Sequence, residues 1–133
     1  MIHYVKQKRT LWVKGEKVER YNARILRSAD TPLDTIAQEI SHATSVSYPD
    51  VLAALKAFEI HVSNHVLNGS AVRFGTLGSF IPTLRTKAVT ESKEVNADTV
   101  RRVTCRFFPS KDFRLKMKTA QLEFKDLDLI KHV

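Results

Sequence analysis

A long apolar stripe in the middle of the chain constrains the fold most. The stretch SYPD (47–50) has the features of a helix start, with Ser47 as the N-cap, and Asn68 and Gly69 form a helix-ending pair. Between them, apolar residues recur at helical spacing, at Val51, Leu55, Phe58, Val62 and Val66. A chain of 133 residues has the size of about one domain, and a core this small is often completed by oligomerisation. We therefore expect this helix to lie in the core of a homodimer.

A shorter helix is predicted just before it, over residues 30–45. Asp30 or Thr31 can cap this helix, and Pro32 fits its first turn. Two adjacent helices raise the alternative of a helix-turn-helix that reads a major groove. The only cation of the longer helix is Lys56, whereas recognition helices normally carry several basic or amide side chains. The pair is therefore interpreted as scaffold and dimer core.

Charge gives the strongest indication of a partner. The formal net charge is +8, from 22 Lys and Arg against 14 Asp and Glu. Residues 1–30 carry eight cations and three acids, and residues 71–118 carry eleven cations and four acids. Residues 31–70 carry one cation and four acids. This pattern favours nucleic acid as the partner, then an anionic membrane surface, over a basic protein that binds neither.

Other classes of function are disfavoured. No apolar run approaches membrane-spanning length, and the N-terminus does not resemble a signal peptide. Cys105 is the single cysteine, so a reducing compartment such as the cytoplasm fits best. His61 and His65 lie one turn apart but lack a third metal ligand. Without a nucleophile elbow or a phosphate loop, we expect no enzyme, cofactor, metal or small-molecule substrate.

The remaining segments indicate strands. Residues 2–26 are typical of two strands around a turn, and Trp12 is expected to cover a small core rather than to stack on a base. Gly78 interrupts a strand-like run at 71–89, which indicates a bend or a close backbone approach. Over 100–108, Val103, Cys105 and Phe107 alternate with Arg102, Thr104, Arg106 and Phe108, so Cys105 is expected to be packed. The polar stretch 90–99 predicts a flexible arm between these strands.

A final short helix is predicted over 109–118, with Ser110 as its N-cap. The tail that follows it has no clear period. The expected division of the chain is therefore an N-terminal extension over 1–30, a main domain over 31–118 with its arm at about 81–106, and a tail over 119–133.

Four stretches together resemble the HU/IHF family of bacterial histone-like DNA-binding proteins. They are the two-helix segment (34–69), VRFGTLGSF, RVTCRFFPSKDFRLK and the arm-length segment between the last two. The first 30 residues indicate the longer HU-like branch with an N-terminal extension. The resemblance implies an α+β, HU/IHF-like fold with two N-terminal helices, a sheet with a protruding two-stranded arm and a short C-terminal helix. It also implies an intertwined homodimer, here with an extra N-terminal β-hairpin.

The function implied by this resemblance is non-enzymatic and architectural. Such proteins bind and bend duplex DNA through β-arms in the minor groove, with low sequence specificity, and condense it in the nucleoid. The implied DNA-binding residues are Arg73, Gly78, Ser79, Arg85, Lys87, Lys93, Arg101, Arg102, Arg106, Lys111, Arg114 and Lys118. The expected dimer core comprises Leu55, Phe58, Val62, Phe80 and Phe107.

The sequence departs from the family at the arm tip. Residues 88–100 contain no proline, whereas the family's arm tip carries a proline that wedges between base pairs. Ser110 also stands where the family motif has glycine, and Phe108 where a basic residue is common. Two alternatives stay open: a sequence-specific, IHF-like regulator, and a protein-interaction module in which DNA binding is incidental.

Overall fold

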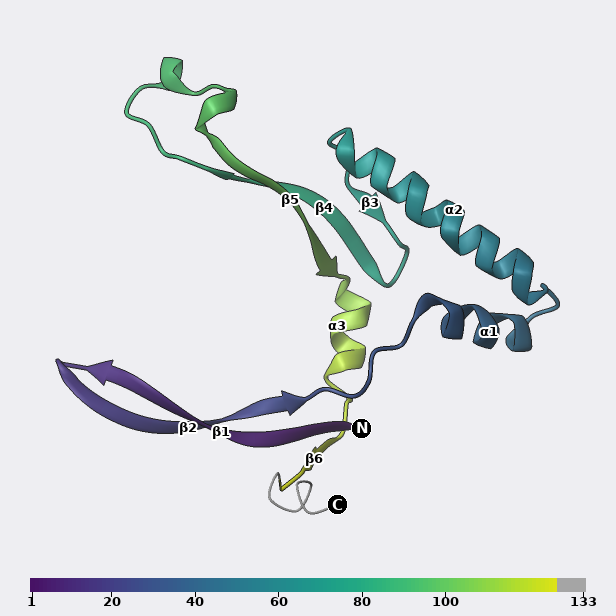
Figure 1. The fold of residues 1–133 in the computed structure, drawn as a ribbon, viewed down its shortest axis with the longest axis horizontal. Helices are drawn as coiled ribbons and strands as arrows, with labels where there is room; N and C mark the ends of the chain where they lie inside the picture. The colour runs from purple at the N-terminus through teal and green to yellow at the C-terminus, as the bar shows by residue number, and fades with distance from the viewer. Residues whose placement is uncertain (127–133) are drawn as a thin grey trace. The chain divides into compact units, whose positions relative to one another are not determined.

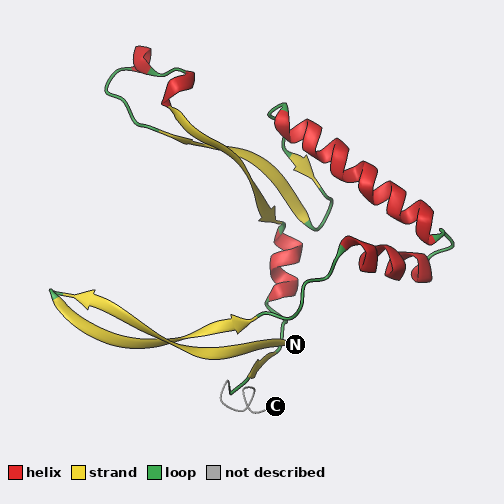
Figure 2. Ribbon diagram, in the orientation of Figure 1, coloured by secondary structure: helices red, strands yellow, loops and turns green. Residues whose placement is uncertain are grey.

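The structure, a computed structural model, describes residues 1–126 and divides into two compact units (Figure 1). The N-terminal unit contains residues 1–30 together with the chain from Lys116 on, and the central unit contains residues 31–115. Strands dominate the N-terminal unit, whereas the central unit combines helices with strands (Figure 2). Each unit is described by itself below.

The N-terminal unit is a three-stranded sheet in the order β2-β1-β6. Strands β1 (Ile2–Val13) and β2 (Glu16–Leu26) form a long antiparallel ribbon. Lys14 and Gly15 connect them, both with positive φ (52° and 80°), as a two-residue type I′ hairpin turn requires. Strand β6 (Leu122–Phe124) pairs in parallel with only the first residues of β1.

Two helices begin the central unit. Helix α1 spans Leu33–Ala43 and helix α2 spans Tyr48–Leu67. The predicted cap of α2 is confirmed, because the Asp50 backbone N–H donates to Ser47 Oγ at 3.4 Å. The predicted cap of α1 is wrong: the helix begins at Leu33, Pro32 takes the N-cap position, and no side chain caps it.

The central sheet has the order β3-β4-β5, and its neighbouring strands are antiparallel. Its strands are β3 (Val72–Arg73), β4 (Gly78–Thr86) and β5 (Val100–Pro109). The segment between β4 and β5 forms two short 3-10 turns, η1 (Ser92–Glu94) and η2 (Ala97–Thr99). Helix α3 (Lys111–Met117) follows β5 directly.

A row of aromatic rings joins α2 to the central sheet. The ring centroids of Phe58 and Phe74 lie 5.4 Å apart, those of Phe74 and Phe80 4.7 Å, and those of Phe80 and Phe107 5.6 Å. Ala37 and Val51 are the only buried apolar side chains among those described in this unit. The central unit therefore has a thin core, and a row of partly exposed aromatic rings lies beside it.

The fold class expected from the sequence is wrong. Instead of an HU/IHF-like fold with two N-terminal helices, residues 1–126 form an α+β structure with three helices and two three-stranded sheets, and strands come first. The N-terminal segment is also more than an added hairpin, because β6 joins it from the far end of the chain. A three-residue strand paired over such a sequence distance carries no local period that could have predicted it.

Two side chains expected to be packed are exposed. Trp12 is 73% exposed, because it lies near the hairpin turn, far from the few residues of β1 that β6 covers. Cys105 shares the face of Val103 and Phe107 on β5, as predicted from alternation, but its thiol is exposed. That face of β5 is therefore exposed to solvent in the single chain.

Candidate nucleic-acid interface

The β4–β5 ribbon carries three arginines on one face. Side chains directly opposite each other in an antiparallel pair lie on the same face, and the register pairs Arg85 with Arg102, Thr83 with Thr104 and Ile81 with Arg106. The alternation predicted for residues 102–108 is thus confirmed. We call Arg85, Arg102, Arg106, Thr83 and Thr104 the arginine face.

The arginine face lines an open groove of about 460 Å³. Its lining residues are Thr83, Leu84, Arg85, Arg102, Thr104, Cys105, Arg106 and Phe108. All three arginines are exposed, and within residues 1–126 none of them forms an ion pair with a carboxylate. Arg85 and Arg102 stand directly opposite each other, which is unfavourable until an anion lies between or above them.

Three further predicted cations lie toward the outer end of the ribbon. Arg101 has no partner in the register, because the pairing shifts between Arg85 and Thr86. The backbone N–H of Lys87 donates to the Thr99 carbonyl at 2.8 Å and so closes the outer end of the ribbon. Lys93, in η1, forms a 3.0 Å ion pair with Glu91, which makes it the weakest candidate for a phosphate contact.

Three predicted cations belong to the opposite end of the sheet. Arg73 is exposed on β3, opposite Ser79, and Lys111 and Arg114 are exposed on α3, just after the residue that pairs with Gly78. Lys118 is exposed beyond α3, in the chain that belongs to the N-terminal unit. Because Arg73 pairs with Ser79, it lies on the same face of the central sheet as Arg85 and Arg106, toward the inner end of that face, whereas Lys111 and Arg114 lie on α3 rather than on the sheet.

Gly78 and Ser79 are both buried at the start of β4. A Cβ atom at Gly78 would lie 2.5 Å from the Phe108 carbonyl oxygen and 2.7 Å from the Phe107 ring. The predicted close backbone approach is thus confirmed, but the approaching group belongs to β5. Contact of these two residues with a phosphate stays a prediction.

Ser110 connects the start of α3 to the loop before β4. Its Oγ accepts from the Phe113 backbone N–H at 3.0 Å, which confirms the predicted N-cap, and its hydroxyl donates to the Thr76 carbonyl. Its backbone N–H donates to the Leu77 carbonyl at 3.1 Å. The serine thus fixes both elements that meet at the base of the ribbon.

Sequence reasoning missed Thr83 and Thr104 as site residues. Their placement beside the arginines depends on the register between two strands, which the local sequence does not show.

The structure shows no group of three metal-ligating side chains within residues 1–126. Over the same residues, it also shows no helix suited to crossing a membrane.

One protein-family model matches residues 1–124, nearly the whole chain. The chain belongs to the HU-HIG family. This family is described as an HU domain fused to a wHTH, Ig or glycine-rich motif. The match includes both the N-terminal ribbon and the central unit, so HU-HIG membership supports the HU-like resemblance, while the particular branch stays a prediction.

A solved structure from Bacteroides vulgatus is similar in fold. That protein, provisionally described as a bacterial DNA-binding protein, matches with a TM-score of 0.61 and 14% sequence identity. The match covers 92% of this chain and 47% of the other, so the chain spans about half the length of that relative. No curated protein matches this sequence.

Proposed function

We propose that this HU-HIG chain is a non-enzymatic architectural DNA-binding protein of the bacterial nucleoid. It binds duplex DNA through the arginine face, with the β4–β5 ribbon in the minor groove. Family membership and the provisional description of the Bacteroides vulgatus protein support DNA as the partner. The net charge of +8 supports a polyanionic partner independently.

The observation that carries this proposal is the arginine face itself. Arg85, Arg102 and Arg106 are exposed, share one side of the ribbon and lack carboxylate partners in the described chain. Exposed arginines without carboxylate partners should gain the most binding free energy from contacts with phosphates, because each contact releases counterions condensed on the DNA. The threonine hydroxyls between them add neutral donors for phosphate oxygens.

Low sequence specificity follows from the kind of groups on this face. The minor groove presents a degenerate pattern of donors and acceptors, so contacts made there distinguish few sequences. The face carries no asparagine or glutamine that could pair with adenine. DNA shape and flexibility are then the main sources of any preference.

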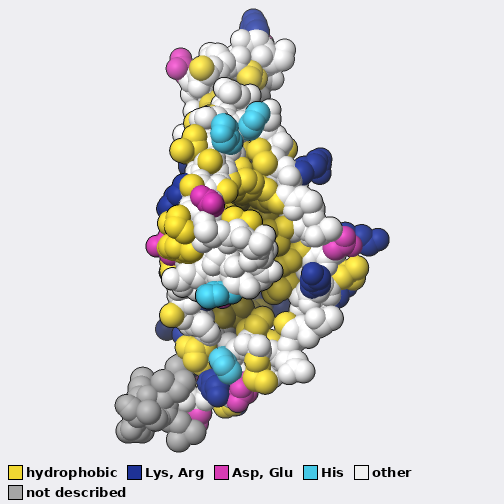
Figure 3. Space-filling model, turned by 90° about the vertical axis from the view of Figure 1, so that its right-hand side faces the viewer, with side chains coloured by type: hydrophobic (Ala, Val, Ile, Leu, Met, Phe, Trp, Pro, Cys, Tyr) yellow, Lys and Arg dark blue, Asp and Glu magenta, His cyan; other side chains and the backbone are white. Residues whose placement is uncertain are grey.

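We also propose that the protein acts as a homodimer. Phe58 and Phe107 are 49% and 42% exposed, and hydrophobic side chains gather on the face drawn in Figure 3. Phe58, Phe74, Leu77, Phe80 and Phe107 line one apolar hollow of about 410 Å³. Val62, Ser63, Val66, Leu67, Phe80 and Cys105 line a second, of about 450 Å³. A second copy would cover these surfaces and complete the thin core.

A gel-shift experiment tests the DNA-binding proposal. The full chain is mixed with a labelled random-sequence duplex and unlabelled competitor, and the variant R85A/R102A/R106A is compared with the parent. Lys56→Ala, an exposed cation on α2, is the control. The triple variant should lose most of the shift and the control should keep it. Equal binding by all three proteins would overturn the assignment to the arginine face.

A comparison of duplexes separates the architectural role from the sequence-specific alternative. Random duplexes and duplexes enriched by repeated selection should bind with similar affinity if DNA is recognised by its backbone and shape. A strong preference for a selected sequence would favour the regulator instead.

A further inference from the structure

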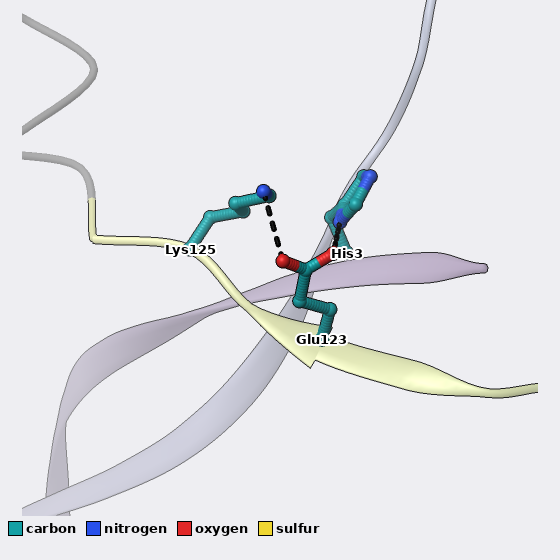
Figure 4. A network of polar contacts seen from close by, with 3 residues as sticks. All are labelled: His3, Glu123 and Lys125. Carbon is teal, nitrogen blue, oxygen red and sulfur yellow. Dashed lines mark hydrogen bonds and ion pairs between the residues drawn. The ribbon is translucent and has the colours of Figure 1, made fainter.

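The ribbon of the N-terminal unit extends well beyond its supporting strand. Strand β6 pairs only with Ile2–Tyr4, so the rest of β1 is paired with β2 alone within the described chain. The base is anchored by Glu123, which lies 3.4 Å from His3 and 3.1 Å from Lys125 (Figure 4). A two-stranded ribbon without further support is only marginally stable, so its length calls for a functional explanation.

Two large aromatic side chains are exposed on one face of this ribbon. Trp12 is 73% exposed and Tyr21 69% exposed. The register pairs Trp12 with Lys17 and Tyr21 with Lys8, so all four side chains share that face. We call these four residues the aromatic face. Trp12 and Tyr21 are four residues apart in the register, which is about 14 Å along the strands.

The ribbon is also strongly basic. Residues 5–24 contain seven cations, Lys6, Lys8, Arg9, Lys14, Lys17, Arg20 and Arg24, against the acids Glu16 and Glu19. On the reverse side, Arg9 and Arg20 are directly opposite each other, a like-charge pair that destabilises a free ribbon. Lys8 forms a 3.0 Å ion pair with Glu19, but both side chains are more than half exposed, so this pair is weak and easily exchanged.

We propose that the β1–β2 ribbon is a second nucleic-acid-binding element, and that its ligand is single-stranded. Trp12 and Tyr21 stack on unpaired bases, while Lys17 and Lys8 contact the phosphates between them. The arginines on the reverse side add attraction for the same polyanion. A single strand is favoured over a duplex because flat aromatic side chains can stack only on bases whose faces are free.

This site belongs to a different ribbon from the arginine face, and the proposal does not depend on duplex binding at that face. Exposed aromatic rings and an opposed arginine pair both cost free energy in the unbound chain, and a single-stranded polyanion relieves both. The simpler explanation of a solvated basic ribbon accounts for the lysines, but not for two exposed aromatic rings on one face.

Intrinsic fluorescence provides a direct test, because Trp12 is the only tryptophan in the chain. The full chain is titrated with oligo(dT), oligo(U) and a duplex of the same length. We expect either single strand to quench Trp12 fluorescence, with the duplex much less effective. Quenching by the duplex as strong as by the single strands, or no quenching at all, would overturn the proposal.

Binding of labelled oligo(dT), followed by anisotropy, then tests the individual side chains. Trp12→Ala and Tyr21→Ala should each weaken binding by about tenfold, whereas Trp12→Phe should stay close to the parent. Leu11→Ala, the neighbouring residue on the opposite face, is the matched control and should change little. An equal loss in the control, or no loss in Trp12→Ala, would show that stacking is not the basis of binding.

A crossed experiment separates this site from the arginine face. The R85A/R102A/R106A variant should keep its Trp12 quenching by oligo(dT), and Trp12→Ala should keep its duplex gel shift. If quenching disappears in the arginine variant, the single strand binds at the β4–β5 ribbon and the proposal for β1–β2 is wrong.

Discussion

At the scale of single residues, Gly78 is the position where one methyl group should matter most. Gly78→Ala places its Cβ against the Phe108 carbonyl and the Phe107 ring, so the ring or the strand must move. We expect a loss of about 1–3 kcal/mol in the free energy of unfolding. Gly69→Ala meets no atom within 4 Å and should lose only about 1 kcal/mol from its positive φ. Denaturant unfolding of both variants compares the two, and a larger loss at Gly69 would contradict this packing.

Ser110 offers a second test at this scale. Ser110→Ala removes the acceptor for the Phe113 N–H and the donor to Thr76, and should cost about 1 kcal/mol of stability. Ser70→Ala, whose side chain is exposed, is the control and should stay within about 0.5 kcal/mol of the parent. Thermal unfolding measures both, and identical curves for the two variants would rule out a structural role for the Ser110 hydroxyl.

At the residue level, local patterns predicted the strand alternation and two helix caps correctly, but not the cap of α1. Alternation correctly separated Arg102 and Arg106 from Cys105, and the caps at Ser47 and Ser110 are confirmed. Prediction from the sequence failed for Trp12, because the exposure of this side chain depends on how far β6 extends along β1. The roles of the individual cations in DNA binding stay predictions.

At the scale of elements, the proposed minor-groove binding makes the tip of the arm the element expected to set the bend of the DNA. Val95 is exposed between η1 and η2, and Glu91, Glu94 and Asp98 are exposed around it. A small side chain among acids makes a poor wedge between base pairs, so we expect only gentle bending. Energy transfer between dyes at the two ends of a short duplex measures the bend. Sharp bending that disappears in Val95→Ser would show that this valine does act as a wedge.

Elements whose caps and apolar pattern lie within one segment could be predicted from the sequence. Elements that form by pairing with a distant segment could not. The apolar stripe and caps of α2 lie within one segment, and the predicted helix is present at Tyr48–Leu67. The tail has no period from which a strand could be predicted, and part of it forms β6, whose three residues gain their structure from pairing with β1. The rest of the tail, residues 127–133, lies outside the described residues.

At the scale of the whole molecule, stability should depend on protein concentration. If a second copy covers Phe58 and Phe107, folding and association are linked, and the melting temperature rises as the protein is concentrated. Phe58→Asp should weaken this association and lower the melting temperature. Sedimentation at micromolar concentration provides the decisive check: a well-folded monomer there would contradict the proposed homodimer.

The salt dependence of duplex binding tests the central claim most directly. Binding through the arginine face predicts that log affinity falls steeply and linearly with log salt concentration. In R85A/R102A/R106A the slope should become shallower by about 0.9 for each phosphate that the variant no longer neutralises, while Lys56→Ala keeps a slope close to that of the parent. A flat salt profile in the parent protein, or an unchanged slope in the triple variant, would contradict the account.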